Sequence, residues 1–442
     1  MIVRRVVRWL DDRLGTNAGA RYLLAKIYPD HWSFYLGEFA LYFFLTLVAT
    51  GIWLTFAFDA SAQGAYGSVL ELADRSHPIG YVIRQIHHWS ADCFVAAILV
   101  HMGRIFFTGA FRRPRELNWM IGLTMLMLAS LTGFTGYSLP GDLLSGTGLR
   151  ISESIALSVP LVGRWGAAVL NGGDSYPGPL LGQHLYTLHV YLLPVSLGAL
   201  IGLHLFLLIY QKHTQFERDP KHVVGRRFWP DYLLRTVAVF GSTLAVLALL
   251  AALVEINPIE DFGPYQPWIA ANGSVPDWYT AFLEGALRIG PASEIHIFGH
   301  PIPPLFWPGL VLPTLAFVLL LLWPFIEKWL TRDDATHHVL DLPTQSPLRI
   351  AVGGALIFEG ILLTLAAADD QTAATLHLRL ETLVWVYRIL FVVGPFIVGW
   401  IGWRIAAERR SRIIESTVYP SEVTTLVRTA EGGFEEEEPQ PA

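Results

Sequence analysis

The sequence predicts an all-α membrane protein with eight transmembrane helices. Of its 442 residues, 53% are hydrophobic and only 15% are charged, whereas soluble proteins carry about 25% charged residues. Residues 39–58 and 117–141 contain no charged side chain, and each run is long enough to cross a hydrocarbon core of about 30 Å. Because backbone groups in lipid must be hydrogen-bonded within their own segment, we expect every long apolar run to be a helix.

The remaining composition excludes several classes of protein. The formal net charge of −6 comes mostly from five glutamates near the C-terminus, Glu431 and 435–438. The rest of the chain is nearly balanced, so nothing indicates a nucleic-acid partner. The single cysteine, Cys93, lies in an apolar run. It excludes a disulfide framework, a CxxCH haem attachment and a cysteine-based zinc or iron–sulfur site.

Eight apolar runs define the expected helices. The segment 1–30 before them is basic and lacks the apolar core of a signal peptide, so we expect it to remain as a surface helix. The predicted spans are 34–58, 82–107, 118–139, 181–211, 234–254, 305–326, 350–368 and 383–405.

The positions of lysine and arginine predict the orientation, because cytoplasmic flanks carry the positive excess. Of the 31 Lys and Arg residues, 23 fall in the N-terminal flank, in the loops after helices two, four and six, and in the C-terminal tail, against five in the alternate loops. Both termini are therefore expected in the cytoplasm. The other three, Arg84, Arg104 and Arg388, lie in or at the ends of apolar helices and need anionic partners.

Two loops on the outer side are unusually long. Residues 142–180 contain two short apolar stretches, 149–157 and 162–170, which we expect to form helices lying against the membrane. Residues 255–304 are rich in Pro, Trp and Gly, and we expect packing to order them. Loops of this length in a compact protein are usually functional or disordered, and the aromatic content favours function.

Paired histidines on the second and fourth predicted helices carry the main functional signal. His87 and His101 are fourteen residues apart, and His189 and His204 are fifteen apart, which corresponds to about 21 Å and 22.5 Å along a helix. Both steps return to within about 60° of one helix face, and the two helices run in the same direction. The four imidazoles therefore predict two stacked bis-histidine haem sites, His87 with His189 and His101 with His204.

Other interpretations of these histidines are weaker. A lone histidine in an apolar helix is more often a hydrogen-bonded structural residue, but four in matching pairs reverse that preference. A structural zinc site needs four ligands close together, whereas these are two and two, separated by most of a membrane. The extra histidines, His88 and His184, are expected to make polar contacts near the outer site.

Four glycines repeat the same interval. Gly37 and Gly51 on the first helix, and Gly122 and Gly136 on the third, are fourteen residues apart. We expect them to clear space where a flat macrocycle approaches the backbone at two depths. The alternative is that they are small residues that let membrane helices pack closely.

Two arginines lie close to the predicted ligands. Arg84 precedes His87 by three residues and Arg104 follows His101 by three, so each shares roughly the face of its ligand. We expect both to pair with haem propionates. Snorkelling of the arginines to the interface is the alternative.

With these motifs, the chain resembles cytochrome b of the quinol–cytochrome c reductase (bc) complexes over nearly all of residues 29–412. PDWY at 276–279 is similar to the family's PEWY motif of the quinol site. The stretches FFTGAFRRPRELNW, GYSLPGDLLSG and QKHTQF look closest to the actinobacterial branch, whose complexes oxidise menaquinol and associate with a cytochrome oxidase. The other matches are the Arg84-x-x-His87 and His101-x-x-Arg104 motifs, the two glycine pairs and GYSLP at 136–140.

Two departures from related proteins limit what the resemblance implies. Tyr35 stands where the plastid-type cytochrome b6 carries the cysteine for a further covalent haem, so that haem is not expected. The acid of the quinol motif is Asp277 rather than glutamate, one methylene shorter. This difference affects the geometry of any proton transfer at the site.

The resemblance implies a domain organisation and an assembly. Residues 1–33 would be a cytoplasmic surface segment, 34–215 the dihaem four-helix bundle, 216–410 a C-terminal four-helix part with the PDWY loop, and 411–442 an acidic cytoplasmic tail. The protein would lie in the plasma membrane and carry electrons and protons across it. The expected partners are a Rieske iron–sulfur subunit, a cytochrome c-type subunit, a second copy of the complex and a cytochrome oxidase.

The resemblance also implies two quinone sites. At the outer site, an acid in a membrane-buried loop is a candidate proton acceptor, and desolvation is expected to raise its pKa. Asp277 is the first candidate, with Tyr279 and Glu284 next, although Asp277 would equally suit a turn after proline. At the inner site, His213 could hydrogen-bond a quinone carbonyl, or could belong only to the basic cytoplasmic flank.

Two other function classes share part of this pattern. A haem-b membrane anchor of another quinone-linked dehydrogenase would use the same histidine chemistry but would not need helices five to eight or the PDWY loop. A secondary transporter would place substrate residues at broken helices rather than paired histidines at fixed depths. A further hypothesis pairs Glu359 in helix seven with Arg388 in helix eight, because two charges in apolar surroundings are less costly as an ion pair.

Overall fold

The computed structural model describes residues 2–15, 24–29, 31–216, 225–269, 275–297, 299–418, 425–428 and 434–437. Within these ranges eight helices are long and apolar enough to cross a membrane, and each predicted span overlaps one of them. They are η1 with α3 (Trp32–Leu54), α5 (Pro78–Phe107), α6 (Glu116–Tyr137), α9 to α10 (Leu181–Tyr210), η3 with α11 (Phe228–Leu253), η5 with α13 (Trp307–Thr331), α14 (Pro347–Ala366) and α16 (Leu380–Val418).

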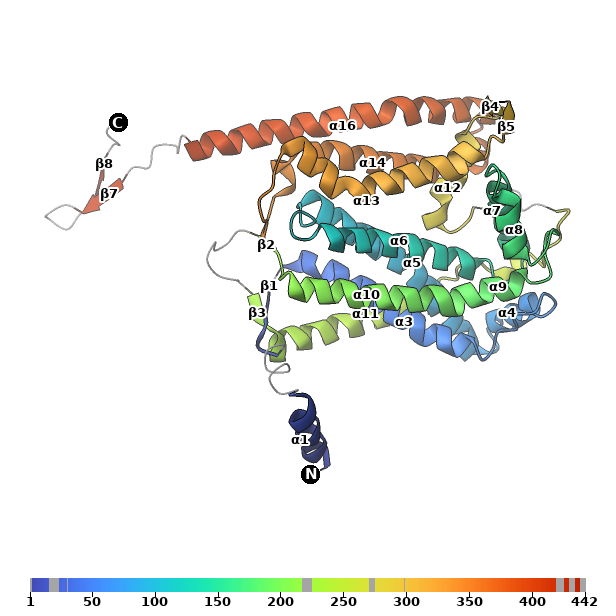
Figure 1. Cartoon of the computed structure of the whole chain (residues 1–442), viewed down its shortest axis with the longest axis horizontal. Coiled ribbons are helices and arrows are strands. Elements are labelled where there is room, and N and C mark those ends of the chain that lie inside the picture. Colours follow the sequence, from blue (N-terminus) through green and yellow to red (C-terminus); the bar gives the residue numbers. More distant parts are fainter. Residues whose placement is uncertain are drawn as a thin grey trace.

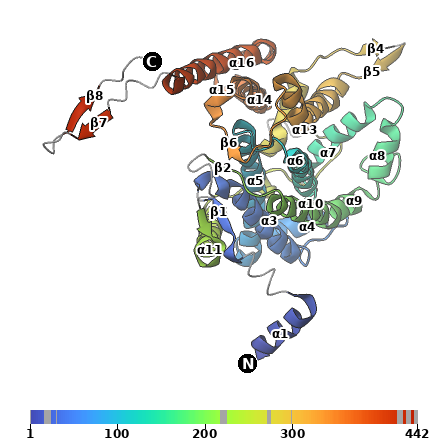
Figure 2. The same ribbon diagram turned by 60° about the vertical axis from the view of Figure 1, so that its left-hand side comes forward.

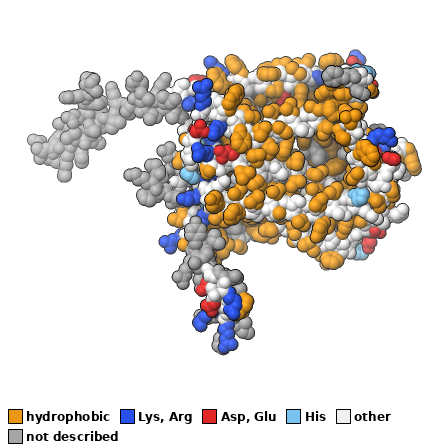
Figure 3. All heavy atoms as spheres, in the orientation of Figure 1, with side chains coloured by type: hydrophobic (Ala, Val, Ile, Leu, Met, Phe, Trp, Pro, Cys, Tyr) orange, Lys and Arg blue, Asp and Glu red, His pale blue; other side chains and the backbone are white. Residues whose placement is uncertain are grey.

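These helices lie side by side along one axis, and the loops gather at the two ends (Figure 1). One end carries short helices, and the other carries α1 (Ile2–Leu14) and the end of α16. Apolar side chains cover the middle of the molecule, whereas Lys and Arg gather mainly at the end that carries the termini (Figure 3). The short helices are α4 (Ala65–Ala73), α7 (Leu143–Leu157), α8 (Gly163–Asn171), α12 (Trp278–Ile289) and α15 (Asp369–Thr375).

The helices form two groups, which Figure 2 shows from a second direction. In the first half, α3 and α11 pack against α5, and α10 packs against α6. In the second half, α14 packs against α16 and α12. The halves meet where Trp323 of α13 joins an aromatic cluster with Phe106, Phe111 and Trp119.

Short strand pairs fasten the loops. Antiparallel β1 (Ile27–Pro29) and β3 (Gly225–Arg227) link the chain before the first span to the chain before the fifth. Parallel β2 (Gln215–Phe216) and β6 (Val339–Leu340) link the ends of the fourth and sixth spans. Two further antiparallel pairs are β4 (Ile295–Ile297) with β5 (His300–Ile302) and β7 (Thr425–Arg428) with β8 (Phe434–Glu437).

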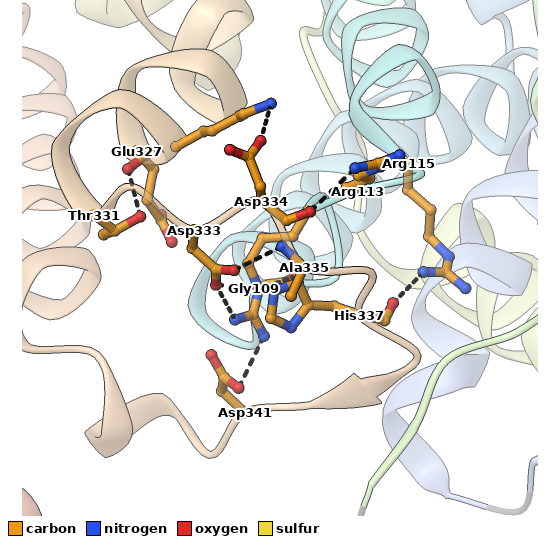
Figure 4. Close-up of polar contacts among 12 residues, drawn as sticks. Gly109, Arg113, Arg115, Glu327, Thr331, Asp333, Asp334, Ala335, His337 and Asp341 are labelled. Atoms are coloured by element: carbon orange, nitrogen blue, oxygen red, sulfur yellow. Dashed lines mark hydrogen bonds and ion pairs between the residues drawn. The ribbon is translucent and has the colours of Figure 1, made fainter.

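A buried ion-pair network joins the two halves at the end that carries the termini. Arg349 of α14 and Glu327 of α13 are only 2% and 4% exposed, and Arg349 donates to both carboxylate oxygens of Glu327. The guanidinium also reaches Asp341 at 2.8 Å, and Arg112, in the loop after α5, contacts the same carboxylate at 2.8 Å. Gly109 lies against Arg349, where a Cβ would be 2.4 Å from the guanidinium nitrogen. Figure 4 shows Gly109, Glu327 and Asp341 of this region without Arg349.

A second arginine completes this connection. Arg115, at the start of α6, donates to the carbonyl oxygens of His337 at 2.6 Å and of Gln211 and Lys212 at 3.2 and 3.0 Å. The contact with His337 is visible in Figure 4. One side chain therefore satisfies carbonyls in two loops that belong to different halves of the protein.

The structure corrects one expectation and adds detail to two others. The Glu359–Arg388 pair is wrong, because Arg388 instead donates to the carbonyls of Ile289 and Gly290 at 2.9 and 2.8 Å. Both carboxylate oxygens of Glu359 are buried without a hydrogen-bond partner among the described residues. The last helix continues to Val418, into the predicted tail, and the long fifth–sixth loop contains α12, which the sequence did not reveal. Glu431 and Glu438 lie outside the described residues.

We predict that Arg349→Met lowers the free energy of unfolding by about 3–5 kcal/mol, since it leaves Glu327 as an uncompensated buried charge. Lys328→Met is the control. It removes a 2.5 Å pair with Asp334 whose side chains are 46% and 73% exposed, and it should cost less than about 1 kcal/mol. Denaturant titration in detergent, followed by tryptophan fluorescence, measures both. Equal losses in the two variants would contradict the role assigned to the buried network.

Candidate functional site

The outer pair of histidines faces across the first bundle. The imidazole rings of His87, on α5, and His189, in the fourth span, have centroids 6.2 Å apart at an interplanar angle of 71°. Thr50 on α3 lies 2.9 Å from Nδ1 of His87, and the carbonyl oxygen of Thr132 on α6 lies 2.9 Å from Nδ1 of His189. These contacts hold each ring by Nδ1 and leave Nε2 as the atom for a metal, as in other metal-ligating histidines.

A local irregularity explains the unequal spacing of the histidines. The fourth span is not one α-helix, because residues Leu188–Leu192 form the π-helical turn η2 between α9 (Leu181–Thr187) and α10 (Leu193–Tyr210). His189 lies in this turn. A π turn holds one residue more than an α turn, so the fifteen-residue step to His204 takes up nearly the same rotation as fourteen residues on α5.

The inner pair lies one histidine step along the same helices. His204, on α10, lies close enough to His101, on α5, for the two side chains to interact electrostatically. Nδ1 of each ring is buried without a hydrogen-bond partner among the described residues. The structure thus brings each predicted ligand into its predicted pair.

Each of the four predicted glycines lies against one of the four histidines. A Cβ at Gly136 would stand 2.3 Å from Cε1 of His189, and one at Gly37 would stand 2.9 Å from Cε1 of His101. The corresponding distances are 3.2 Å for Gly51 to His87 and 3.9 Å for Gly122 to His204. Gly136, Gly37 and Gly51 therefore admit the imidazole rings themselves, whereas a Cβ at Gly122 would make only an ordinary contact with His204.

Two buried arginines have unsatisfied donors beside these pairs. Arg84 donates to the carbonyl oxygen of Asn257 at 3.2 Å, but its second amino group is buried without a partner among the described residues. Arg104 stacks 4.3 Å above the ring of Phe34, and its Nε and one amino group likewise lack a partner there. Buried guanidinium donors without acceptors are costly. They fit an anionic group such as a haem propionate next to each histidine pair.

No group of three or more His, Cys, Asp or Glu residues in the described part of the chain is arranged to hold a metal ion. The histidines stand two and two at separate depths. This donor set suits an iron that already has four equatorial ligands and needs two axial imidazoles. It does not suit a tetrahedral zinc site, the competing interpretation of the sequence.

Asp277 lies at the centre of a hydrogen-bonded cluster beside the outer pair. Its side chain is 7% exposed and faces Nε2 of His88 at 3.2 Å. Asn257 donates to it at 2.9 Å, and the hydroxyl of Tyr279 donates at 3.1 Å. Asp277 directly precedes α12 without capping it through its side chain.

The electrostatics of Asp277 differ from the sequence expectation. Burial raises the pKa of the carboxyl group. The hydrogen bond and charge of His88, together with the hydrogen bonds of Tyr279 and Asn257, lower the pKa by more than burial raises it, so it lies below its ordinary value. The sequence had led us to expect that desolvation would raise this pKa. The donors that stabilise the carboxylate come from residues 189 and 20 positions away in sequence, so the motif alone could not reveal them.

The other two candidates at the outer site have different surroundings. Tyr279 is buried against Gly133 of α6, and burial with the nearby Asp277 raises the pKa of its hydroxyl. Glu284 forms a 2.8 Å ion pair with Arg288, which also contacts Asp369 at 2.6 Å. Burial nevertheless raises the pKa of Glu284. Glu284 is thus tied to the α12–α15 contact, one step away from the Asp277 cluster.

The inner candidate His213 lies against aromatic side chains near the end that carries the termini. Its ring centroid is 4.8 Å from that of Tyr28, which stacks on Tyr232 at 4.6 Å. Burial, with the charges of Lys26 and Arg115, lowers the pKa of His213 to about 4. Nε2 of His213 and the amino group of Lys26 are buried without partners among the described residues.

Some residues of the site carried no recognisable sequence signal. Thr50 and Thr132 orient the outer imidazoles, and Asp92 lies one helical turn beyond His88, yet none of them belongs to a spaced motif. His88 contacts the quinol-motif acid directly. His184 lies 2.9 Å from the carbonyl oxygen of Leu170.

Comparisons with known proteins agree with this arrangement. A family model described as "Cytochrome b(N-terminal)/b6/petB" matches residues 92–264. The cytochrome bc1 complex cytochrome b subunit of Mycobacterium leprae is 42% identical, over 93% of this chain and 79% of that protein. The corresponding subunit of Streptomyces coelicolor is 41% identical, over 97% of this chain and 82% of that protein.

A solved structure supports the fold. The "Hyperthermophilic respiratory Complex III" superposes with a TM-score of 0.65 at 22% identity, over 90% of this chain and 99% of that chain. Among the described residues, eight helices can cross a membrane, and the first bundle of these holds the paired histidines. This arrangement is that of an integral-membrane cytochrome of the b type. The chain belongs to the family of cytochrome bc1 complex cytochrome b subunits, components of a quinol–cytochrome c reductase.

We predict that Gly136→Ala removes the outer haem from the spectrum, because the new methyl group would stand 2.3 Å from Cε1 of His189. Gly122→Ala on the same helix is the matched control, since its methyl group would meet His204 only at 3.9 Å, an ordinary van der Waals distance. Dithionite-reduced difference spectra of the purified variants measure the haem content. Equal haem loss in both variants would show that the contact distance does not decide binding.

Proposed function

We propose that this cytochrome b subunit holds two non-covalent b haems, one at each histidine pair. The observation that carries the proposal is the pairing of His87 with His189 and of His101 with His204 at two depths of one bundle. Bound haem iron supplies one-electron transfer between the two depths. The protein would contribute the imidazoles as iron ligands, glycine backbones close to them, and Arg84 and Arg104 as partners for propionates.

The outer quinol site is proposed at the Asp277 cluster. Its polar groups come from the PDWY loop and from α5, on which His88 of this cluster directly follows His87 of the outer pair. A haem held by the outer pair would therefore lie near a quinol bound here. Asp277 accepts a proton from the bound quinol, and Tyr279 and Asn257 hold the carboxylate in place. Glu284, tied to Arg288, is proposed to take part at the edge of this site.

The inner quinone site is proposed beside His213. With its pKa lowered to about 4, His213 is neutral at physiological pH. A neutral imidazole can donate an N–H to a quinone carbonyl, and Nε2 of His213 faces no other partner among the described residues. Lys26, also without a partner there, adds a positive charge that would stabilise a reduced quinone oxygen.

The setting of the reaction follows from the family. We propose that the substrate is menaquinol, that the protein lies in the plasma membrane with both termini in the cytoplasm, and that turnover moves protons outward. The proposed partners are a Rieske iron–sulfur subunit, a cytochrome c-type subunit, a second copy of the complex and a cytochrome oxidase. The collection of basic side chains at the end that carries both termini supports this orientation (Figure 3).

Replacing one ligand tests the number of haems. His101→Ala should remove the inner haem and leave the outer one, because the two pairs share no ligand. His184→Ala is the control, because His184 contacts the carbonyl oxygen of Leu170. This variant should retain both haems. Haem per polypeptide and the reduced spectrum distinguish these results. Loss of both haems in a stably inserted His101→Ala variant would contradict two independent sites.

The outer quinol site has its own test. Asp277→Asn should preserve both haem spectra and slow quinol oxidation, because the amide keeps the shape but takes no proton. General-base losses are about 10²–10⁴-fold, and since the depressed pKa makes this carboxylate a weak base, we expect about 10²-fold.

Asp277→Glu is the conservative control and should have a mild effect, since it keeps a base and only lengthens its arm. Quinol–cytochrome c reductase rates in the assembled complex give the measurement. An Asn variant that turns over at the parental rate across the pH range would assign Asp277 to the turn before α12 and not to proton transfer.

A further inference from the structure

The outer cluster contains a second carboxyl group, Asp92 of α5. Asp92 follows His88 by four residues on the same helix, so both side chains lie on one face, with Asp92 about 6 Å farther into the membrane. His88 contacts Asp277. Both carboxyl groups therefore lie near His88, one on the loop before α12 and one on α5.

The hydrogen bonding of the two carboxyl groups is unequal. Asp277 is engaged by His88, Asn257 and Tyr279. Oδ1 of Asp92 is buried and has no hydrogen-bond partner among the described residues. The indole of Trp278, at the start of α12, is a hydrogen-bonding neighbour of Asp92. A buried oxygen without a donor in the membrane is costly unless something else supplies a proton or a hydrogen bond.

The surroundings of Asp92 belong to the outer site. Asp92 interacts electrostatically with four titratable groups. These are Asp277 and Tyr279 from the PDWY segment, and His88 and Cys93 from its own helix. The other helices packed on α5, namely α3, α4, α6, α11 and α14, bring no further charged group to it among the described residues. Asp92 therefore interacts with the quinol motif and with little else.

We propose that Asp92 is a second proton acceptor of the outer quinol site and takes one of the two protons that each quinol releases. The inference rests on the outer site proposed above. In this step a quinol O–H bond breaks and an O–H bond forms on Oδ1 of Asp92. The electron pair stays on the quinol oxygen, and both electrons leave through the acceptors of the quinol–cytochrome c reductase reaction.

The test compares three variants in the assembled complex. Asp92→Asn keeps an oxygen for the Trp278 indole but cannot take a proton, Asp92→Glu restores the acid, and Asp92→Ala removes both functions. Because only the carboxylate accepts a proton, the parental rate should rise with pH through the titration of Asp92. Asp92→Asn should slow quinol oxidation at least tenfold and flatten this acid limb, with both haem spectra retained, and Asp92→Glu should recover much of the rate.

Glu359→Gln is the matched control, because Glu359 is also a buried membrane carboxyl without a partner among the described residues but lies on α14. Its rate and pH profile should match the parent. The proposal is overturned if Asp92→Asn slows turnover no more than Glu359→Gln does. It is also overturned if only Asp92→Ala is slow, since that result assigns Asp92 to positioning Trp278.

The failure of this inference can be told from the failure of the proposed outer site. Normal turnover of Asp92→Asn together with slow turnover of Asp277→Asn removes Asp92 from the reaction and leaves the outer site in place. Normal turnover of both variants removes the outer site from this cluster, and the Asp92 inference with it.

Discussion

The fold depends on one constraint, which is that polar groups inside a membrane must find partners within the protein. The four paired imidazoles are the clearest consequence. Their rings need close backbones, and Gly37, Gly51, Gly122 and Gly136 provide them. Their positions need matching depths, and the π-helical turn at Leu188–Leu192 accommodates the one extra residue between the histidines of the fourth span. Helix spacing and helix irregularity in the first bundle thus serve the same two sites.

The same constraint shapes the charged groups elsewhere. Where a charge serves structure, the protein pairs it completely, as with Arg349, Glu327 and Asp341 at the junction of the two halves. Among the described residues, several unpaired groups lie beside the histidines and at the proposed quinone sites, as with Arg84, Arg104, Asp92 and His213, whereas Glu359 on α14 is unpaired away from them. Because the protein can pair buried charges completely, the unsatisfied groups beside the histidines and the proposed quinone sites indicate function.

The outer cluster shows how tertiary contacts change the chemistry of a sequence motif. PDWY presents an acid, and burial alone would raise its pKa. The contacts of Asp277 with His88 and Asn257 lower it instead. A carboxylate stabilised in this way is a weaker base than burial alone would make it.

The sequence by itself determined the eight spans, the two histidine pairs, the four glycines and the family resemblance, because periodicity along a helix converts directly into depth and face. It could not determine which groups meet across helices. The π turn at His189, the threonines behind the imidazoles, helix α12, the partners of Arg388 and the contact between His88 and Asp277 all depend on packing between distant segments. Spacing records only neighbours on one helix, whereas the pairing of Asp277 with a residue 189 positions away is decided by how the helices assemble.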